Sequence, residues 1–154
     1  MTSEVLSPAT STAGETLAAE AWRRVRSISD DPGTVAAAHE IMHGNGLTGT
    51  TLRVLSLLPL TGSLPMRELA SRMGCDNSYV TSLVDSLEQL GLAGRESHPT
   101  DRRRKVIVLT ELGRQLAQRV HQMYATPPAA FATLTEAEIA TLCALLRKLD
   151  PAGA

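Results

Sequence analysis

The stretch that most constrains this chain runs over residues 65–110, where two short helices, a tight turn and a charged hairpin are predicted in succession. Residues 66–73 suit a short helix, and Gly74 is the residue type that best fits the left-handed position ending one. Asp76 can cap a second helix over residues 77–90. One face of that second helix is apolar at helical spacing and consists of Val80, Leu83, Val84, Leu87 and Leu90.

The opposite face of the second helix is small and polar. It consists of Asn77, Ser78, Thr81, Ser82 and Asp85. Two apolar extended runs follow, residues 92–97 and 105–109, and the segment between them ends in a five-residue stretch with four basic side chains, residues 101–105. A helix, a turn, a second helix and a basic loop form a pattern typical of DNA-binding proteins. The pattern therefore predicts a DNA-binding lobe.

Overall charge gives no separate indication of a nucleic-acid partner, because 15 Lys and Arg residues stand against 16 Asp and Glu residues for a formal net charge of -1. The charges are unevenly placed along the chain. Residues 1–50 contain six acids and three arginines, whereas residues 101–105 contain four cations and one acid. Any affinity for DNA must therefore come from local charge placement.

The two cysteines, Cys75 and Cys143, lie far apart and show no metal-ligand spacing, which favours reduced thiols, although a disulfide stays open. No basic start followed by an apolar segment is present near Met1, and no apolar window is long enough for a membrane span. We expect a cytoplasmic protein with no membrane partner.

The flanking segments predict further helices. Residues 1–14 are too poor in apolar groups to predict order, and a helix is expected from Glu15. Asp31 and Pro32 predict the start of a helix that ends at Gly44. Thr48 is predicted to cap the next helix, which ends before Pro59. The expected buried stripes are Leu17, Ala21, Val25 and Ile28 in the first of these helices and Leu52, Leu55 and Leu58 in the third.

Two more helices are expected after the hairpin. Thr110 is predicted to cap the first of them, which ends before Pro127. Thr135 and Glu138 have the spacing of a capping box at the start of the last helix. Their expected buried stripes are Leu112, Leu116, Val120 and Met123, then Ile139, Leu142, Leu146 and Leu149. Because apolar stripes at both ends of the chain need a cover, we expect a symmetric homodimer. The predicted divisions are a disordered tail (1–14), N-terminal dimerisation and effector-pocket helices (15–46), a DNA-binding lobe (47–110) and C-terminal dimerisation helices (111–150).

Residues 39–43 match the pattern H-E-x-x-H, in which two histidines one turn apart bind zinc beside a glutamate base. Gly46 extends the match, but Gly49 stands where the longer pattern needs a third histidine. A helix that happens to contain two histidines is the preferred interpretation, so no catalytic residue, metal or cofactor is expected. The alternatives are a metal-responsive regulator and a metal-dependent hydrolase that uses His39, Glu40 and His43.

From residue 47 to 113 the chain resembles the MarR family of bacterial transcription regulators, which are winged helix-turn-helix homodimers. The motifs behind the resemblance are Glu68-Leu69-Ala70, residues 80–88, Gly91-Leu92 and residues 101–110 with Gly113. The resemblance implies a mainly α fold with a small β-hairpin, in which a winged helix-turn-helix lobe lies between N- and C-terminal dimerisation helices. It also implies a repressor that binds a palindromic duplex operator.

The resemblance further implies which residues contact DNA. Residues 77–82 would enter the major groove, Arg103 at the wing tip would reach the minor groove, and Asp101 would orient it. The full expected set is Asn77, Ser78, Tyr79, Thr81, Ser82, Asp101, Arg102, Arg103, Arg104 and Lys105. Ser82 and Ser86 stand where such proteins often have Arg or Lys, which shifts the expected electrostatic contribution to the wing.

Members of the family often bind a small aromatic or phenolic compound between the dimer helices and the DNA-binding lobe. The resemblance then implies an effector site built from Trp22, His39, Met42, His43 and Arg53. A third alternative, a protein-interaction module with a degenerate DNA-binding fold, is kept open by the near-zero net charge and by the serines at 82 and 86.

Overall fold

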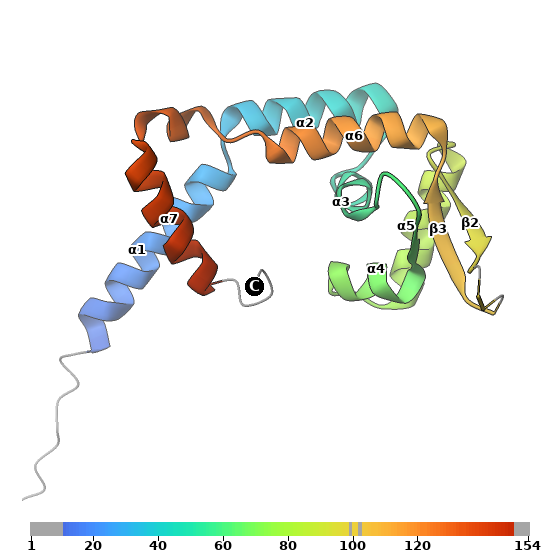
Figure 1. Ribbon diagram of the computed structural model, residues 1–154, viewed down its shortest axis with the longest axis horizontal. Helices are drawn as coiled ribbons and strands as arrows, with labels where there is room; N and C mark the ends of the chain where they lie inside the picture. Colours follow the sequence, from blue (N-terminus) through green and yellow to red (C-terminus); the bar gives the residue numbers. More distant parts are fainter. Residues whose placement is uncertain (1–10, 99, 102, 150–154) are drawn as a thin grey trace, which may run out of the picture. The chain divides into compact units, whose positions relative to one another are not determined.

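The computed structural model describes residues 11–98, 100–101 and 103–149, with side chains from residue 16 onward. The helices and strands in these residues are shown in Figure 1. They are α1 (Ser11–Ser29), α2 (Pro32–Asn45), α3 (Gly49–Leu57), β1 (Ser63–Pro65), α4 (Met66–Met73), α5 (Asn77–Gln89), β2 (Ala93–Ser97), β3 (Lys105–Leu109), α6 (Glu111–Ala125), the 3-10 helix η1 (Ala129–Thr133) and α7 (Glu136–Leu149). Two structural units are present: residues 34–126 form one, and α1 belongs with η1 and α7 in the other.

Local capping interactions explain where α2 and α3 end and begin. α2 continues one residue beyond Gly44, and the chain then turns at Gly46, whose φ is +67°. Thr48 caps α3 as predicted, because its Oγ1 accepts a hydrogen bond from the Thr51 N–H at 3.2 Å, while Thr51 Oγ1 accepts one from the Thr48 N–H at 2.9 Å. This reciprocal pair satisfies two backbone donors that a helix start would otherwise leave free.

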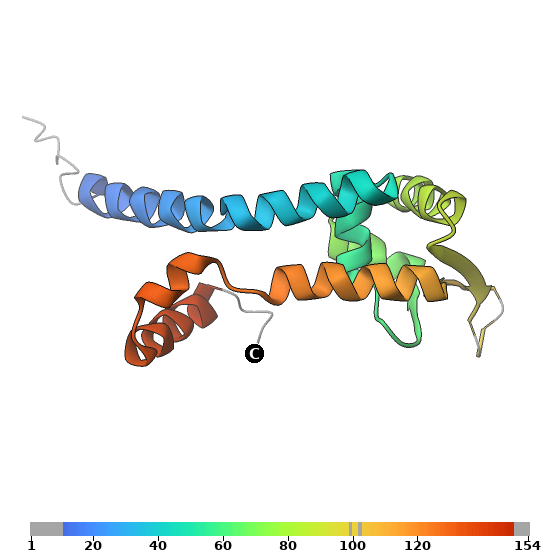
Figure 2. The same ribbon diagram turned by 90° about the horizontal axis from the view of Figure 1, so that it is seen from above.

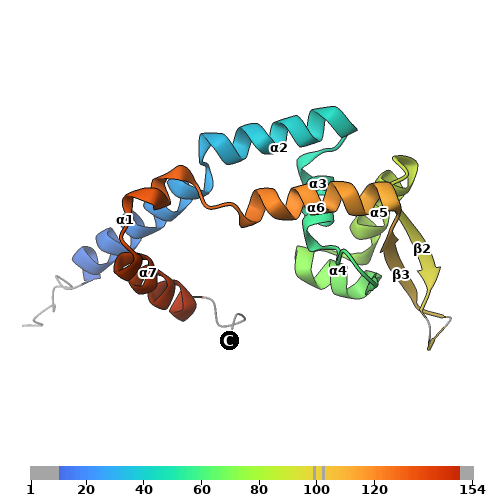
Figure 3. The same cartoon turned by 45° about the horizontal axis from the view of Figure 1, so that its top comes forward.

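The helix pair α4 and α5 begins and ends where the sequence predicts. α4 ends at Gly74, whose φ of +66° is the left-handed conformation that glycine adopts at low cost. Asp76 caps α5 by accepting a hydrogen bond from the Tyr79 N–H at 2.8 Å. α4 and α5 pack on each other and on α3 (Figure 3).

The fold contains a three-stranded antiparallel sheet with the order β1-β3-β2, in which β1 precedes α4 and the other two strands follow α5. The predicted hairpin is present as β2 and β3, with Ala93 opposite Leu109 and Ser97 opposite Lys105. The extended link at residues 63–64 also pairs with β3, which adds β1 as an edge strand. Pro65 fits the end of an edge strand because it has no N–H to donate. The hairpin projects beyond α4 and α5 in Figures 1 and 2.

One core lies between α3, α5, α6 and the sheet, and its largest fully buried side chains are Leu55, Leu58, Leu69, Leu87, Ile107, Val54, Val80, Val84, Val106 and Val120. Within residues 34–126, two described residues of the predicted buried stripes are exposed. Leu90 is the C-cap of α5, and the buried Leu92 fills the core after it. Leu112 faces solvent because the neighbouring Gly113 packs against the backbone of Leu92.

The unit that contains α1 and α7 keeps its apolar side chains at its surface. α1 begins at Ser11, four residues before the predicted start, because extending a formed helix costs far less than nucleating one. In α1, Leu17, Trp22 and Ile28 are exposed. α7 begins as predicted, since the Glu138 carboxylate accepts hydrogen bonds from the N–H and the hydroxyl of Thr135, both at 2.8 Å.

The two units divide the chain differently from the predicted boundaries at residues 46 and 110. α2 and α6 belong with the helix-turn-helix elements and the sheet in residues 34–126. The reason is shared burial: Ile41 of α2 and Leu116, Ala117 and Val120 of α6 are in the same core as the buried face of α5. The tail predicted for residues 1–14 lies outside the described residues up to position 10. Among the residues that are described, none of the helices has the length and apolar character needed to cross a bilayer.

Candidate nucleic-acid interface

The first two turns of α5 present a polar face to solvent. Asn77, Ser78, Thr81 and Ser82 are exposed, as predicted from their spacing, and Tyr79, which only the family resemblance implied, is exposed beside them. The Thr81 hydroxyl donates to the Asn77 carbonyl at 2.8 Å, and its oxygen keeps its lone pairs to accept a hydrogen bond. A helix face of this kind can approach base edges closely and can both donate and accept hydrogen bonds.

The turn between β2 and β3 is held by its own backbone. The Arg104 N–H donates to the Asp101 carbonyl at 2.9 Å, and the His98 N–H donates to the Arg104 carbonyl at 2.9 Å. The Asp101 carboxylate accepts a hydrogen bond from the Arg103 N–H at 3.1 Å, so this acid shapes the turn on which the Arg103 side chain stands. Arg103, Arg104 and Lys105 are exposed, whereas Arg102 lies outside the described residues.

A cleft of about 480 Å³ joins the start of α4, the start of α5 and this hairpin loop. Its lining residues are Pro65, Met66, Arg67, Asn77, Asp101, Arg103, Arg104 and Lys105. Four of these side chains are cations and one is an acid, so the cleft suits an anion. The sequence patterns did not predict a role for Arg67, because its only local signal is a basic side chain in the first turn of α4.

Arg95 of β2 connects the hairpin to α5. Its guanidinium contacts the Asp85 carboxylate at 2.6 Å, forms a second ion pair with Glu88, and donates to the Thr81 carbonyl at 2.9 Å. The side chain is only 23% exposed. Local sequence patterns give no signal for Arg95, because its partners lie 7 to 14 positions away along the chain.

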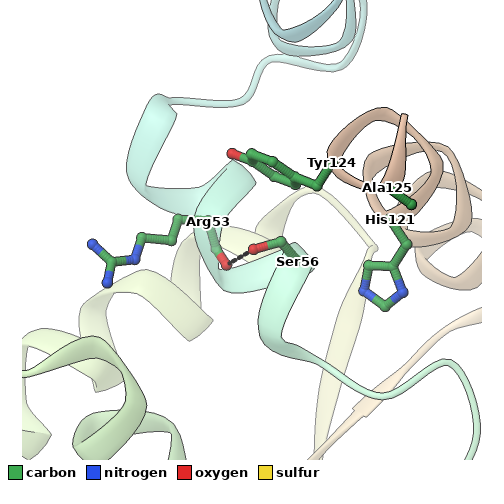
Figure 4. Close-up of a pocket in the computed structure, with 5 residues that line it drawn as sticks. All are labelled: Arg53, Ser56, His121, Tyr124 and Ala125. Carbon is green, nitrogen blue, oxygen red and sulfur yellow. Dashed lines mark hydrogen bonds between the residues drawn. The ribbon is translucent and has the colours of Figure 1, made fainter. Parts of the chain in front are cut away.

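A second pocket lies between α3 and α6 and is lined by Arg53, Ser56, His121, Tyr124 and Ala125 (Figure 4). The Tyr124 ring lies over α3, and Arg53 extends its guanidinium away from His121. His121 Nε2 is 3.3 Å from the Leu55 carbonyl oxygen. A carbonyl oxygen only accepts, so we assign the proton to Nε2, which leaves Nδ1 of the neutral ring free to accept a hydrogen bond.

The residues expected at an effector site are not gathered in this pocket. Of the five, Arg53 alone lines it. Met42 packs half-buried against the core, and the rings of His39 and His43 are exposed on α2 with centroids 6.2 Å apart. Trp22 belongs to the other unit. His121 and Tyr124 were missed, because their approach to α3 is not visible in local spacing.

The H-E-x-x-H match lies on α2 without a third ligand. In the parts of the chain that the structure describes, no group of three His, Cys, Asp or Glu side chains could hold a metal ion. Glu40 instead lies 3.9 Å from the Arg119 guanidinium of α6. Both cysteines are free thiols: Cys75 is half-buried against the core, and Cys143 is exposed on α7.

Comparison with known proteins identifies the fold and its role. A model of the MarR family matches residues 47–105. A transcriptional regulatory protein assigned to the hcr operon of Thauera aromatica is 34% identical over 113 residues, which cover 73% of this chain and 68% of that protein. The chain belongs to the MarR family. MarR proteins are transcription regulators and not enzymes, which excludes the hydrolase alternative for residues 39–43.

Solved structures of MarR-type proteins agree with this assignment. A MarR family protein from Bacillus stearothermophilus is 26% identical and superposes with a TM-score of 0.68, covering 88% of this chain and 94% of its own. The transcriptional repressor CouR, solved on a 23-mer DNA duplex, is 23% identical with a TM-score of 0.66 and covers 96% and 99% of the two chains. The winged helix fold is confirmed, and the protein is a DNA-binding transcription regulator rather than an interaction module.

Proposed function

We propose that this MarR-family protein represses transcription as a homodimer that binds a palindromic operator and responds to a small ligand. The main support for the mode of DNA binding is the cleft that joins the polar face of α5 to the cationic hairpin loop. In this mode Asn77, Ser78, Tyr79, Thr81 and Ser82 enter the major groove. The loop of Asp101, Arg103, Arg104 and Lys105, together with Arg102, follows the backbone into the adjacent minor groove.

The charge of the cleft favours a backbone phosphate at its centre. α5 itself contains no basic residue, so cations near its first turn must come from other elements. Arg67 of α4 supplies one and the hairpin loop supplies Arg103, Arg104 and Lys105. Contacts with phosphates set the orientation of the protein, and contacts with base edges supply sequence preference. Arg67 is thus assigned to phosphate binding and Arg103 to the minor groove.

These two assignments predict different behaviour. Arg103→Ala should weaken operator binding by about 1 to 3 kcal/mol, which is about fivefold to 150-fold in affinity. Arg67→Ala should weaken binding to all duplexes about equally and reduce the slope of log K against log salt by about 1. Fluorescence anisotropy titrations at several salt concentrations measure both effects.

Arg72→Ala is the matched control for Arg67, because Arg72 is on the same helix but is paired with Glu68 and donates to the Leu57 carbonyl of α3. Its salt slope should equal that of the wild type. An unchanged affinity and slope for both Arg67→Ala and Arg103→Ala would remove the cleft from the mechanism.

The homodimer is supported by apolar side chains exposed on α1 and on α7. They include Leu17, Trp22, Val25 and Ile28 on α1 and Leu145, Leu146 and Leu149 on α7. Large contiguous apolar patches are rare on monomers and mark interaction surfaces. A twofold partner buries the same stripe twice and fixes the spacing of two recognition helices.

The ligand site is proposed at the pocket between α3 and α6. Arg53 offers a cation and His121 Nδ1 offers a hydrogen-bond acceptor, while the Tyr124 ring offers an aromatic surface. A carboxylate pairs with a guanidinium, and a phenolic O–H donates to a neutral imidazole nitrogen. The pocket therefore suits an aromatic compound with an anionic group at one end and a hydroxyl at the other.

4-Hydroxybenzoate is a suitable probe for this pocket. Calorimetry should detect its binding to the wild-type protein, with weaker binding to Arg53→Ala and to His121→Phe, and its addition should release the operator. Arg119→Ala is the control, because Arg119 lies on α6 outside the pocket-lining residues. Equal binding by Arg53→Ala and the wild-type protein would move the ligand site elsewhere.

A further inference from the structure

The recognition helix of this protein has an unfavourable charge for its task. Over its thirteen residues, α5 contains two acids, Asp85 and Glu88, and no cation. DNA presents a dense array of negative phosphates, so two free carboxylates on the inserted helix would oppose binding. The repulsion must be offset by a neighbouring element.

Arg95 is the neighbouring cation that meets both acids. Its guanidinium reaches the Asp85 carboxylate at 2.6 Å and also pairs with Glu88. The same group donates to the carbonyl of Thr81, whose side chain is exposed, at 2.9 Å. One residue of β2 thus contacts three residues of the DNA-facing helix, Thr81, Asp85 and Glu88, which lie at i, i+4 and i+7.

The environment of these groups strengthens their interaction. Arg95 is 23% exposed and Glu88 is 32% exposed, whereas Asp85 at 48% is more open to solvent. Screening by salt is weaker for partly buried pairs than for pairs at the surface. The backbone of Arg95 is also held in β2, where it is paired with Ile107 of β3. Arg95 therefore connects the β2–β3 hairpin to α5.

We infer that Arg95 is a positioning residue for DNA binding: it neutralises Asp85 and Glu88 and thereby lets an acidic recognition helix enter the major groove at a fixed angle to the wing. The inference rests on the DNA-binding function and adds to it a residue that need not touch DNA. It also explains how α5 can function with serine at positions 82 and 86.

The test compares three full-length variants by anisotropy on a selected operator at several salt concentrations. Arg95→Gln should lose at least tenfold in affinity at low salt, and the loss should shrink as salt screens the exposed carboxylates. The triple variant Arg95→Gln, Asp85→Asn and Glu88→Gln should recover most of that loss. A residue needed only to hold the helix in place would give neither the salt dependence nor the recovery.

Arg114→Gln is the matched control. Arg114 makes the same kinds of bond, with the Glu111 carboxylate at 2.7 Å and the Leu109 carbonyl at 3.0 Å, but its partners are not on α5. Its affinity for the operator should stay within about twofold of the wild type, and thermal unfolding of each variant checks that it is folded.

Two results would overturn the inference alone: wild-type affinity in Arg95→Gln, or a triple variant that binds as weakly as Arg95→Gln. Failure of the wild-type protein to bind any selected duplex would instead overturn both the proposed mode of DNA binding and this inference.

Discussion

Gly113 illustrates how one residue can determine the contact between a helix and the sheet. It is the third residue of α6, and its N–H donates to the Thr110 hydroxyl at 3.0 Å. A Cβ atom at this position would lie 1.7 Å from the Leu92 carbonyl oxygen and 2.7 Å from the Leu92 carbonyl carbon. No side chain can be accommodated there unless α6 moves away from the hairpin.

Gly113→Ala should therefore lower the free energy of unfolding by about 3 kcal/mol or more, as severe overpacking does. Urea unfolding followed by circular dichroism measures the change. Gly94→Ala is the control in β2, where an added Cβ meets no atom within 4 Å, and it should stay within about 0.5 kcal/mol of the wild type. Equal stability of both variants would contradict the packing described for α6.

At the scale of elements, the helix starts are set by short side-chain caps. The Glu138 carboxylate accepts hydrogen bonds from the backbone N–H and from the hydroxyl of Thr135, and these hold its pKa below the ordinary value of a glutamate. A carboxyl whose pKa falls on folding stabilises the folded state above its unfolded pKa. That contribution is lost as the pH falls through the folded value.

Glu138→Gln should therefore be less stable than the wild type above about pH 4.5, and the difference should close as the pH falls below the lowered pKa of Glu138. Unfolding measured from pH 7 to pH 3 gives the two curves. A difference that stays constant over this range would show that the charge of Glu138 does not stabilise the start of α7.

The same caps show how much of the fold could be predicted from sequence. Thr48, Asp76, Thr110 and Thr135 were all predicted as caps, and each makes the expected hydrogen bond, because capping depends on residues three positions apart. The pairing of β1 with β3 was not predicted, since it joins positions some 45 residues apart, such as Ser63 and Val108.

The candidate site was predictable to the same extent. The exposed face of α5 and the cationic loop follow from periodicity and charge, and both are present. Arg67 and Arg95 gain their importance from neighbours that are distant in sequence. Of the five residues expected at an effector site, Arg53 alone lines the pocket proposed for the ligand, because α3 and α6 meet only after the chain has folded.

At the scale of the whole molecule, the proposed dimer depends on the apolar surface of α7. A groove there is lined by Leu134, Ala137, Glu138, Thr141, Leu142 and Leu145. Leu145→Arg should place a charge in the dimer interface and reduce the mass found by sedimentation from about twice 16.4 kDa to 16.4 kDa. It should also weaken operator binding.

Leu112→Arg is the control for this substitution, because Leu112 is comparably exposed but lies on α6 in the other unit. It should leave the mass of the dimer unchanged. If the dimer persists in Leu145→Arg and dissociates in Leu112→Arg, the interface does not lie on α7 and the proposed dimer is wrong.

The central claim is that two winged helix lobes bind one duplex with α5 in the major groove and the basic loop in the minor groove beside it. Hydroxyl-radical footprinting of the wild-type protein on DNA selected from a random pool tests it most directly. A symmetric dimer should give two symmetric protected half-sites whose centres are one helical turn, about 10.5 base pairs, or a multiple of it apart. Each half-site should be flanked by minor-groove protection that disappears in Arg103→Ala. A single asymmetric footprint, or minor-groove protection unchanged in Arg103→Ala, would contradict the account.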